Sequence, residues 1–161
     1  MNPTDAFIAE LKIEAPLTRK MLERVPSDKL GWRPHPKSST LGRVASHIAG
    51  IPALFIASLL QDEFDYTTYT SKTDTVPEIL DTFDGNIARA REVVSALTPE
   101  QMMARWRFYH GDQLIFELPR FVVIRSTALN HMIHHRGQLS VYLRLLDVPL
   151  PSIYGPSADE R

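Results

Sequence analysis

The sequence predicts an all-α protein built as a four-helix bundle, with an irregular arm between the third and fourth helices. Three observations support this fold class. Four long segments repeat apolar residues in steps of three and four, which is the period of an amphipathic helix. Stretches rich in proline and turn-forming residues separate these segments, and no convincing sheet pattern is present. At 161 residues the chain can bury one full hydrophobic core, so we assign residues 1–161 to a single bundle domain.

The first helix is expected from about Thr4, a suitable N-cap, to about Val25. Pro16 lies inside this segment and should kink the helix or split it in two. Residues 26–39 are rich in proline and turn formers and should form an extended connection. The predicted buried stripe of the helix is Phe7, Leu11, Ala15, Leu22 and Val25.

A second helix is expected to begin after a cap at Ser39 or Thr40 and to run to about Leu60. Pro52 should bend it. Its apolar line again follows steps of three and four, and it includes one histidine among the residues that should face the core. The line is Val44, His47, Ile51 and Leu54.

The next stretch, residues 61–74, is polar with little apolar periodicity, and we expect a connecting loop with solvated carboxylates. Thr75 and Glu78 have the spacing of a capping box and should open a third helix that runs to about Leu97. Residues 105–119 alternate aromatic and polar side chains around a Gly-Asp pair. This alternation predicts a short hairpin or an irregular arm.

The fourth helix is expected from Phe121 to Leu146, and the proline-rich tail after it should run back along the bundle. Gly137 inside the helix suggests that another helix backbone approaches closely there. The side opposite its buried line is also apolar, so this side is either surrounded by the bundle or used in a homodimer. That side carries Val122, Leu129, Met132, Val141, Leu143 and Leu145.

Two histidines of the fourth helix, His131 and His135, fall on the line where core residues are expected. They should lie about 6 Å apart along the helix axis and about 40° apart around it, so both rings can reach one metal ion. A single buried histidine is usually a hydrogen-bonded core residue. Together with His47, however, three inward-facing imidazoles from two helices supply a facial set of neutral nitrogen donors. Three protein ligands that leave open positions are typical of a reactive metal site rather than a closed structural one.

Composition excludes several classes of function. The net charge of −1 and the pI near 6.6 give no electrostatic reason to expect nucleic acid or an anionic membrane as a partner. The absence of cysteine excludes thiolate ligands and a cysteine nucleophile, so any metal must be held by nitrogen and oxygen. No signal-peptide pattern opens the sequence, and the longest apolar run, Ile48–Leu60, is shorter than the roughly 20 residues of a membrane span. A cytoplasmic protein is expected.

Two blocks of the sequence carry a family resemblance. The first is Trp32–Gly50, with a histidine early in the second helix, and the second is Leu129–Glu160, with an H-x-x-x-H-R-G-Q core. On these residues the sequence resembles the DinB superfamily, the DNA-damage-inducible and thiol-transferase-like four-helix bundles of bacteria. The resemblance implies a homodimer and a divalent metal, typically nickel or zinc. Its three histidine ligands map onto His47, His131 and His135.

Characterised members of that superfamily include transferases that add low-molecular-weight thiols to electrophiles, and a thiol-dependent isomerase. The main hypothesis is therefore a metal-dependent thiol S-transferase acting on a small-molecule substrate. Because the chain has no cysteine, the thiol would arrive as a small molecule such as bacillithiol, mycothiol or glutathione. Four side chains near the ligands could orient substrate or support a ligand, although none is assigned as general base. They are His134, Arg136, Gln138 and Tyr142.

Other functions remain open on the same residues. A metal-assisted hydrolase would use a bound water in place of the thiol. A non-catalytic protein would bind a metal or a small apolar ligand, in a stress response for example. A structural dimer with empty histidines is the plainest alternative. No glutamate stands beside the histidines as in a zincin, and no Glu-x-x-His pattern of a di-iron bundle occurs.

Overall fold

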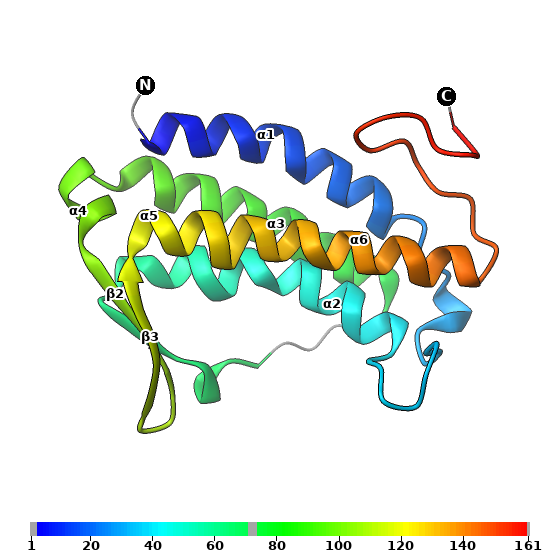
Figure 1. Ribbon diagram of the computed structural model, residues 1–161, viewed down its shortest axis with the longest axis horizontal. Helices are drawn as coiled ribbons and strands as arrows, with labels where there is room; N and C mark the ends of the chain where they lie inside the picture. The colour runs from blue at the N-terminus through cyan, green and yellow to red at the C-terminus, as the bar shows by residue number, and fades with distance from the viewer. Residues whose placement is uncertain (1–2, 71–73, 161) are drawn as a thin grey trace.

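The computed structural model describes residues 3–70 and 74–160 and shows long helical segments packed side by side (Figure 1). The predicted all-α bundle with an arm between its last two long helices is confirmed. Four segments form the bundle: α1 (Pro3–Leu22); α2 (Leu41–Ile51) with its continuation through Leu60; α3 (Val76–Ala96); and the run of α5 (Arg120–Val122), residues 123–129 and α6 (Asn130–Leu145). A short helix, α4 (Pro99–Met103), precedes the arm.

Proline 16 does not split the first helix. α1 is continuous from Pro3 to Leu22, with Pro16 exposed inside it. The proline removes one backbone hydrogen bond. Leu11 and Leu22 on either side of it are nevertheless buried in the core, and α1 packs against α3 and α6. Packing on both sides therefore holds the two halves in one helix.

The second and fourth long helices both depart from regular α-helical winding over part of their length. α2 begins after Thr40, whose hydroxyl accepts a hydrogen bond from the backbone N–H of Arg43. At Pro52 the regular α-helix gives way to a π-helical turn, Pro52–Ile56, followed by a 3₁₀ turn, Ala57–Leu60. Before α6, residues Val123–Leu129 form a second π-helical segment. The two π-helical segments pack against each other, and such wide turns are often found at functional sites.

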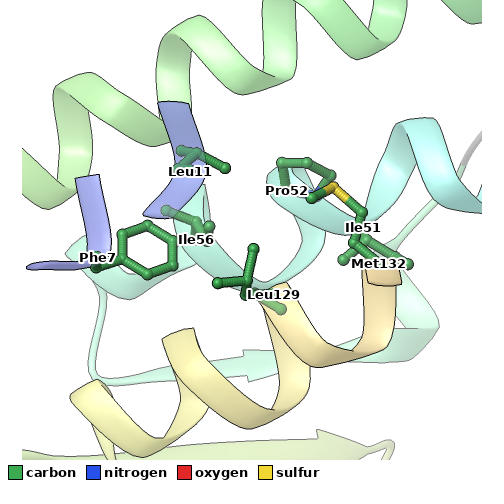
Figure 2. A pocket seen from close by; sticks show the side chains of 8 residues that line it. Phe7, Leu11, Ile51, Pro52, Ile56, Leu129 and Met132 are labelled. Carbon is green, nitrogen blue, oxygen red and sulfur yellow. The ribbon is translucent and has the colours of Figure 1, made fainter. Parts of the chain in front are cut away.

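A small cavity lies between the π-helical segments and α1, and Figure 2 shows the apolar side chains that enclose it. Its volume is about 10 Å³, roughly the space that one water needs. This cavity is too small for an organic ligand and counts against a core site for a small apolar molecule. Its lining is Phe7, Leu11, Ile51, Pro52, Ile56, Ala128, Leu129 and Met132.

The arm is a β-hairpin of β2 (Arg105–His110) and β3 (Gln113–Pro119), which turns at Gly111 with φ of 58°. A third strand, β1 (Glu63–Asp65), pairs in parallel with β2, so the sheet order is β1-β2-β3. The expectation of a connecting loop over residues 61–74 is wrong for its first part, because β1 and a helical turn at Tyr66–Thr68 lie there. Residues 71–73 lie outside the described residues.

The C-terminal tail has no helix and returns along the bundle toward the end of α1 (Figure 1). Arg24, two residues after the end of α1, pairs with Glu160, and Arg144 in α6 pairs with Asp159. None of the helices in residues 3–70 and 74–160 combines the length and apolar character needed to cross a membrane.

The expectation of a close helix approach at Gly137 is wrong, because a Cβ added there would meet no atom within 4 Å. The tight approach occurs instead at Gly42 in the first turn of α2. A Cβ on Gly42 would lie 3.1 Å from the carbonyl oxygen of Leu30. The glycine thus lets the connection before α2 pack against the start of that helix.

Candidate metal centre

Three histidine rings from two neighbouring helices converge at one point of the bundle. The Nε2 atom of His131 lies 3.3 Å from Nε2 of His47 and 2.9 Å from Nε2 of His135. One ring nitrogen from each histidine lies within 4.8 Å of the others, so the group could hold a metal ion. His47 comes from α2 and the other two from α6, helices that pack side by side. The three rings are half-buried.

Helix geometry explains the convergence. His131 and His135 stand one turn apart, so both rings leave the same face of α6. His47 lies between the buried residues Val44 and Ile51 on the face of α2 that meets the core. The two predicted buried lines therefore meet at the three histidines.

The hydrogen bonds of the rings orient their lone pairs toward one another. Nδ1 of His135 lies 2.8 Å from Oε1 of Gln138, and the ring of His131 is hydrogen-bonded to the backbone of Thr127. Protons on the outer nitrogens leave the Nε2 atoms of both rings as acceptors. Acceptors that face each other at 2.9 Å can share only a cation, so the arrangement suits a proton or a metal ion.

The donor spacing fits a mid-row divalent ion. Metal–nitrogen bonds of about 2.0–2.1 Å place neighbouring donors about 2.9–3.4 Å apart when the angle between them is about 90–110°. The two contacts of His131, at 2.9 and 3.3 Å, fall in this range. No carboxylate or further ligand of the described chain belongs to the group. Three neutral imidazoles suit nickel, zinc, copper or iron and do not distinguish among them.

Burial keeps all three rings ready to bind a cation. It lowers the pKa of His47 to about 4, with repulsion from the other two rings and from Arg43 adding to the effect. Burial also lowers the pKa of His131 and of His135. All three imidazoles are therefore neutral at pH 7, which is the form that ligates a metal.

These pKa shifts predict an acid-sensitive metal-free protein. The pKa of His47 is about 4 in the folded chain against an ordinary value of 6.5, so the unfolded chain binds more protons between these pH values. Stability should therefore fall as the pH is lowered from about 6.5 to about 4. Urea denaturation of the metal-free protein across this range measures the fall. The fall should be smaller in His47→Gln and unchanged in His35→Gln, an exposed histidine of the proline-rich connection. Equal slopes in all three proteins would contradict the prediction.

An open cleft of about 250 Å³ borders the histidines. Two of the three rings, those of His47 and His135, form part of its wall. A metal on the three nitrogens would therefore keep coordination positions that a small molecule could reach. The lining of this cleft is Ser39, Arg43, Val44, His47, Tyr66, His135 and Gln138.

The four side chains predicted to support the ligands occupy different places. Gln138 lies beside the three histidines, where it contacts His135 and lines the open cleft. His134 is exposed, with its ring centroid 4.9 Å from that of His135. Tyr142, one helical turn after Gln138 in α6, is buried, and its hydroxyl donates a hydrogen bond to the carbonyl of Ser39 at 3.3 Å.

Arg136 is not brought to the histidines. Its guanidinium points toward α1 and donates to Glu14 at 2.7 Å and to Thr18 at 3.1 Å. It therefore cannot orient a ligand in the open cleft.

Sequence reasoning missed Arg43, Tyr66 and Tyr69, which lie beside the histidines. Tyr66 lines the open cleft and, together with Tyr69, an adjoining recess of about 60 Å³ that also reaches His47. Aromatic residues within the otherwise polar stretch 61–74 were the available signal, because a solvated loop has no need for them. Arg43 could have been found from its position one turn before His47.

Comparison with known proteins agrees with this architecture. The chain is 26% identical to the uncharacterized protein YrdA of Bacillus subtilis strain 168, over 97% of this chain and 90% of that protein. A DinB-like protein from Bacillus cereus ATCC 10987 has a similar structure, with a TM-score of 0.75 and 24% identity over 93% of this chain and 97% of that one. The DinB-like protein YjoA from Bacillus subtilis aligns with a TM-score of 0.72 and 18% identity over 97% and 99% of the two chains.

At these identities the solved structures support the fold alone. The sequence model of the DinB family matches residues 1–161. On that match over the whole chain, the protein belongs to the DinB family.

Proposed function

We propose that this protein is a metal-dependent S-transferase that joins a small-molecule thiol to an electrophile. The observation that carries the proposal is a group of three neutral imidazoles, two of which form part of the wall of an open cleft. A divalent ion on these nitrogens, with nickel or zinc the first candidates, would lower the pKa of a thiol and favour the nucleophilic thiolate. The sulfur bonds to the electrophilic carbon, the leaving group departs with its electron pair, and the thiol proton passes to water.

The residues of the chain have separate tasks in this scheme. His47, His131 and His135 hold the ion, and Gln138 fixes the ring of His135 by accepting a hydrogen bond from its Nδ1. The chain has no cysteine, so the thiol must come from outside, and the open cleft gives it access.

The thiol reaction suits this site better than hydrolysis does. A hydrolase of this kind usually needs a carboxylate to take a proton from the attacking water. Among the described residues, no aspartate or glutamate belongs to the histidine group or lines the open cleft. A thiol ionises about seven pKa units more readily than water, so it needs less help from a base.

A conjugation assay tests the proposal. Protein loaded with nickel or zinc is mixed with monochlorobimane and with bacillithiol, mycothiol or glutathione, and the fluorescent product is followed. At least one thiol should react faster than its uncatalysed rate, with saturation. Metal-free protein and His131→Ala should lose the acceleration, while His35→Ala, which alters an exposed histidine outside the centre, should keep it.

Two other outcomes separate the alternatives. Tight binding of one metal without acceleration of any thiol would favour a metal-binding protein without this activity. Failure to bind metal at all would leave a helical bundle with a structural role.

We also propose that the protein is a homodimer in the cytoplasm. Val141 and Leu145 on α6 are each 58% exposed, which supports an association through this helix. Leu129, Met132 and Leu143, which belong to the same predicted apolar side, are buried inside the bundle and are not available for this association.

A further inference from the structure

The open cleft carries an arginine whose role the proposed reaction does not explain. Arg43 lies in the first turn of α2, four residues before His47, so both side chains leave the same face of the helix. Its side chain lines both the open cleft and the adjoining recess. Residues four apart are about 6 Å apart along a helix axis, so one small molecule can touch both.

The guanidinium of Arg43 has no partner within the described chain. Within residues 3–70 and 74–160 no hydrogen bond or ion pair reaches its side chain, and only its backbone N–H is bound, by Thr40. Nine other arginines of the same ranges are paired with carboxylates. Arg33 and Arg91 also have no carboxylate partner within the described residues, but of these three arginines only Arg43 lines the open cleft beside the histidines.

The charge around Arg43 is unbalanced. Neither the open cleft nor the recess has an aspartate or glutamate in its described lining. A divalent ion held by three neutral rings would make the cleft more positive still. The surroundings thus favour an anionic ligand.

The wall facing this charge is aromatic. Tyr66 lines both spaces beside Arg43, and its ring stacks on that of Tyr69 with the centroids 6.1 Å apart. Asp65 holds this turn in place, since its carboxylate accepts hydrogen bonds from the backbone N–H groups of Thr67 and of Gly111 in the hairpin. The cleft therefore has a cation at one point and a supported apolar face beside it.

We infer that Arg43 is the anion-binding residue of this cleft, and that the ligand taken there bears a carboxylate which pairs with its guanidinium while the apolar part packs against Tyr66. A guanidinium can bind a carboxylate through two parallel hydrogen bonds, which fixes orientation as well as position. Either the thiol or the electrophile can supply the carboxylate. That the bound ligand is a substrate rests on the proposed function, whereas carboxylate binding by Arg43 can be measured without any reaction.

Calorimetry with matched probes tests the binding. Benzoate and its neutral counterpart benzamide represent a carboxylate electrophile, and glutathione and its diethyl ester represent a carboxylate thiol. Each is titrated into metal-free and zinc-loaded protein, so that direct binding of the carboxylate to metal is separated from binding to Arg43. At least one acid should bind more tightly than its neutral counterpart in both forms of the protein.

Variants assign the effect to the guanidinium. Arg43→Gln should weaken binding of the preferred acid about 10- to 100-fold, the usual range for a hydrogen bond to a charged group, without changing binding of the neutral probe. The affinity of Arg43→Lys for the acid should lie between those of the wild type and Arg43→Gln, because lysine keeps the positive charge but cannot donate two parallel hydrogen bonds. Arg89→Gln, which alters an exposed arginine of α3 paired with Glu92, should bind like the wild type.

The probes also identify the source of the carboxylate. An effect confined to benzoate assigns it to the electrophile, and an effect confined to glutathione assigns it to the thiol. Equal binding of acids and neutral counterparts, binding by neither acid, or acid binding unchanged in Arg43→Gln would overturn the inference. If no thiol is conjugated while Arg43 still selects carboxylates, the proposed function fails and the inference stands. If Arg43→Gln conjugates carboxylate substrates with an unchanged KM, the inference fails and the function stands.

Discussion

Replacing His131 by alanine is expected to lower the affinity of the protein for zinc or nickel by about 100-fold or more. His131 is the central ring, since its Nε2 lies within 3.3 Å of Nε2 in both His47 and His135. Structural zinc sites contribute about 10–16 kcal/mol through four ligands, so loss of one ligand removes about 2.5–4 kcal/mol. Competition against a chromophoric chelator, with elemental analysis of the purified protein, measures the change.

Two neighbouring variants make this experiment specific. His134→Ala removes an exposed histidine of the same helix, next to His135, and should leave metal affinity unchanged. Gln138→Ala removes the acceptor at 2.8 Å from Nδ1 of His135 and should weaken affinity about 10- to 100-fold, as loss of a supporting partner does. A wild-type affinity in His131→Ala, or an equal loss in His134→Ala, would rule out the three-histidine centre.

The metal centre could be predicted from the sequence because it depends on local helix geometry. His131 and His135 share a face of α6 through their spacing alone, and His47 falls on the apolar line of α2. Both lines face one core, and the packing of α2 against α6 brings the three rings to the same level. The capping box at Thr75 and Glu78 likewise fixed the start of α3, because it needs contacts only three residues apart.

The surroundings of the histidines were not predictable in the same way. Tyr66 reaches the open cleft because β1 pairs with β2, which joins Glu63 to Arg107 across more than forty residues. A three-residue strand with the sequence Glu-Phe-Asp is too short for its pattern to predict such a distant partner. The absence of an acidic residue beside Arg43 within the described residues likewise depends on the tertiary fold, which the local sequence does not reveal.

Closeness in sequence was a poor guide on α6. Arg136 follows His135 directly, yet one residue of helix turns its side chain by about 100°, so it points toward α1. Gly137 stands in the same motif but meets open space. Side chains that support a ligand are better sought three or four residues away, where Gln138 stands relative to His135.

Removing Glu14 is expected to destabilise the protein by about 3–5 kcal/mol, the usual loss when one partner of a buried ion pair is deleted. The side chain of Arg136 is 3% exposed and that of Glu14 is 9% exposed, with 2.7 Å between Nη1 and Oε2. The hydroxyl of Tyr154 in the tail donates to the same Oε2 at 2.8 Å. Glu14→Ala would leave the guanidinium buried without its carboxylate. Urea denaturation with circular dichroism measures the loss in the metal-free protein.

A double variant tests whether this loss of stability comes from the unpaired buried charge of Arg136 or from the loss of the ion pair itself. If the loss comes from an uncompensated buried charge, the double variant Glu14→Leu with Arg136→Met should regain most of the stability, because apolar side chains of similar size need no partner. Arg89→Ala, which breaks the exposed pair with Glu92, should cost less than about 1 kcal/mol. A double variant as unstable as Glu14→Ala would instead mean that the hydrogen bonds from Arg136 to Thr18 and Tyr154 hold α1, α6 and the tail together. In that case the position of α6, and of its two histidines, would depend on this arginine although it lies outside the metal centre.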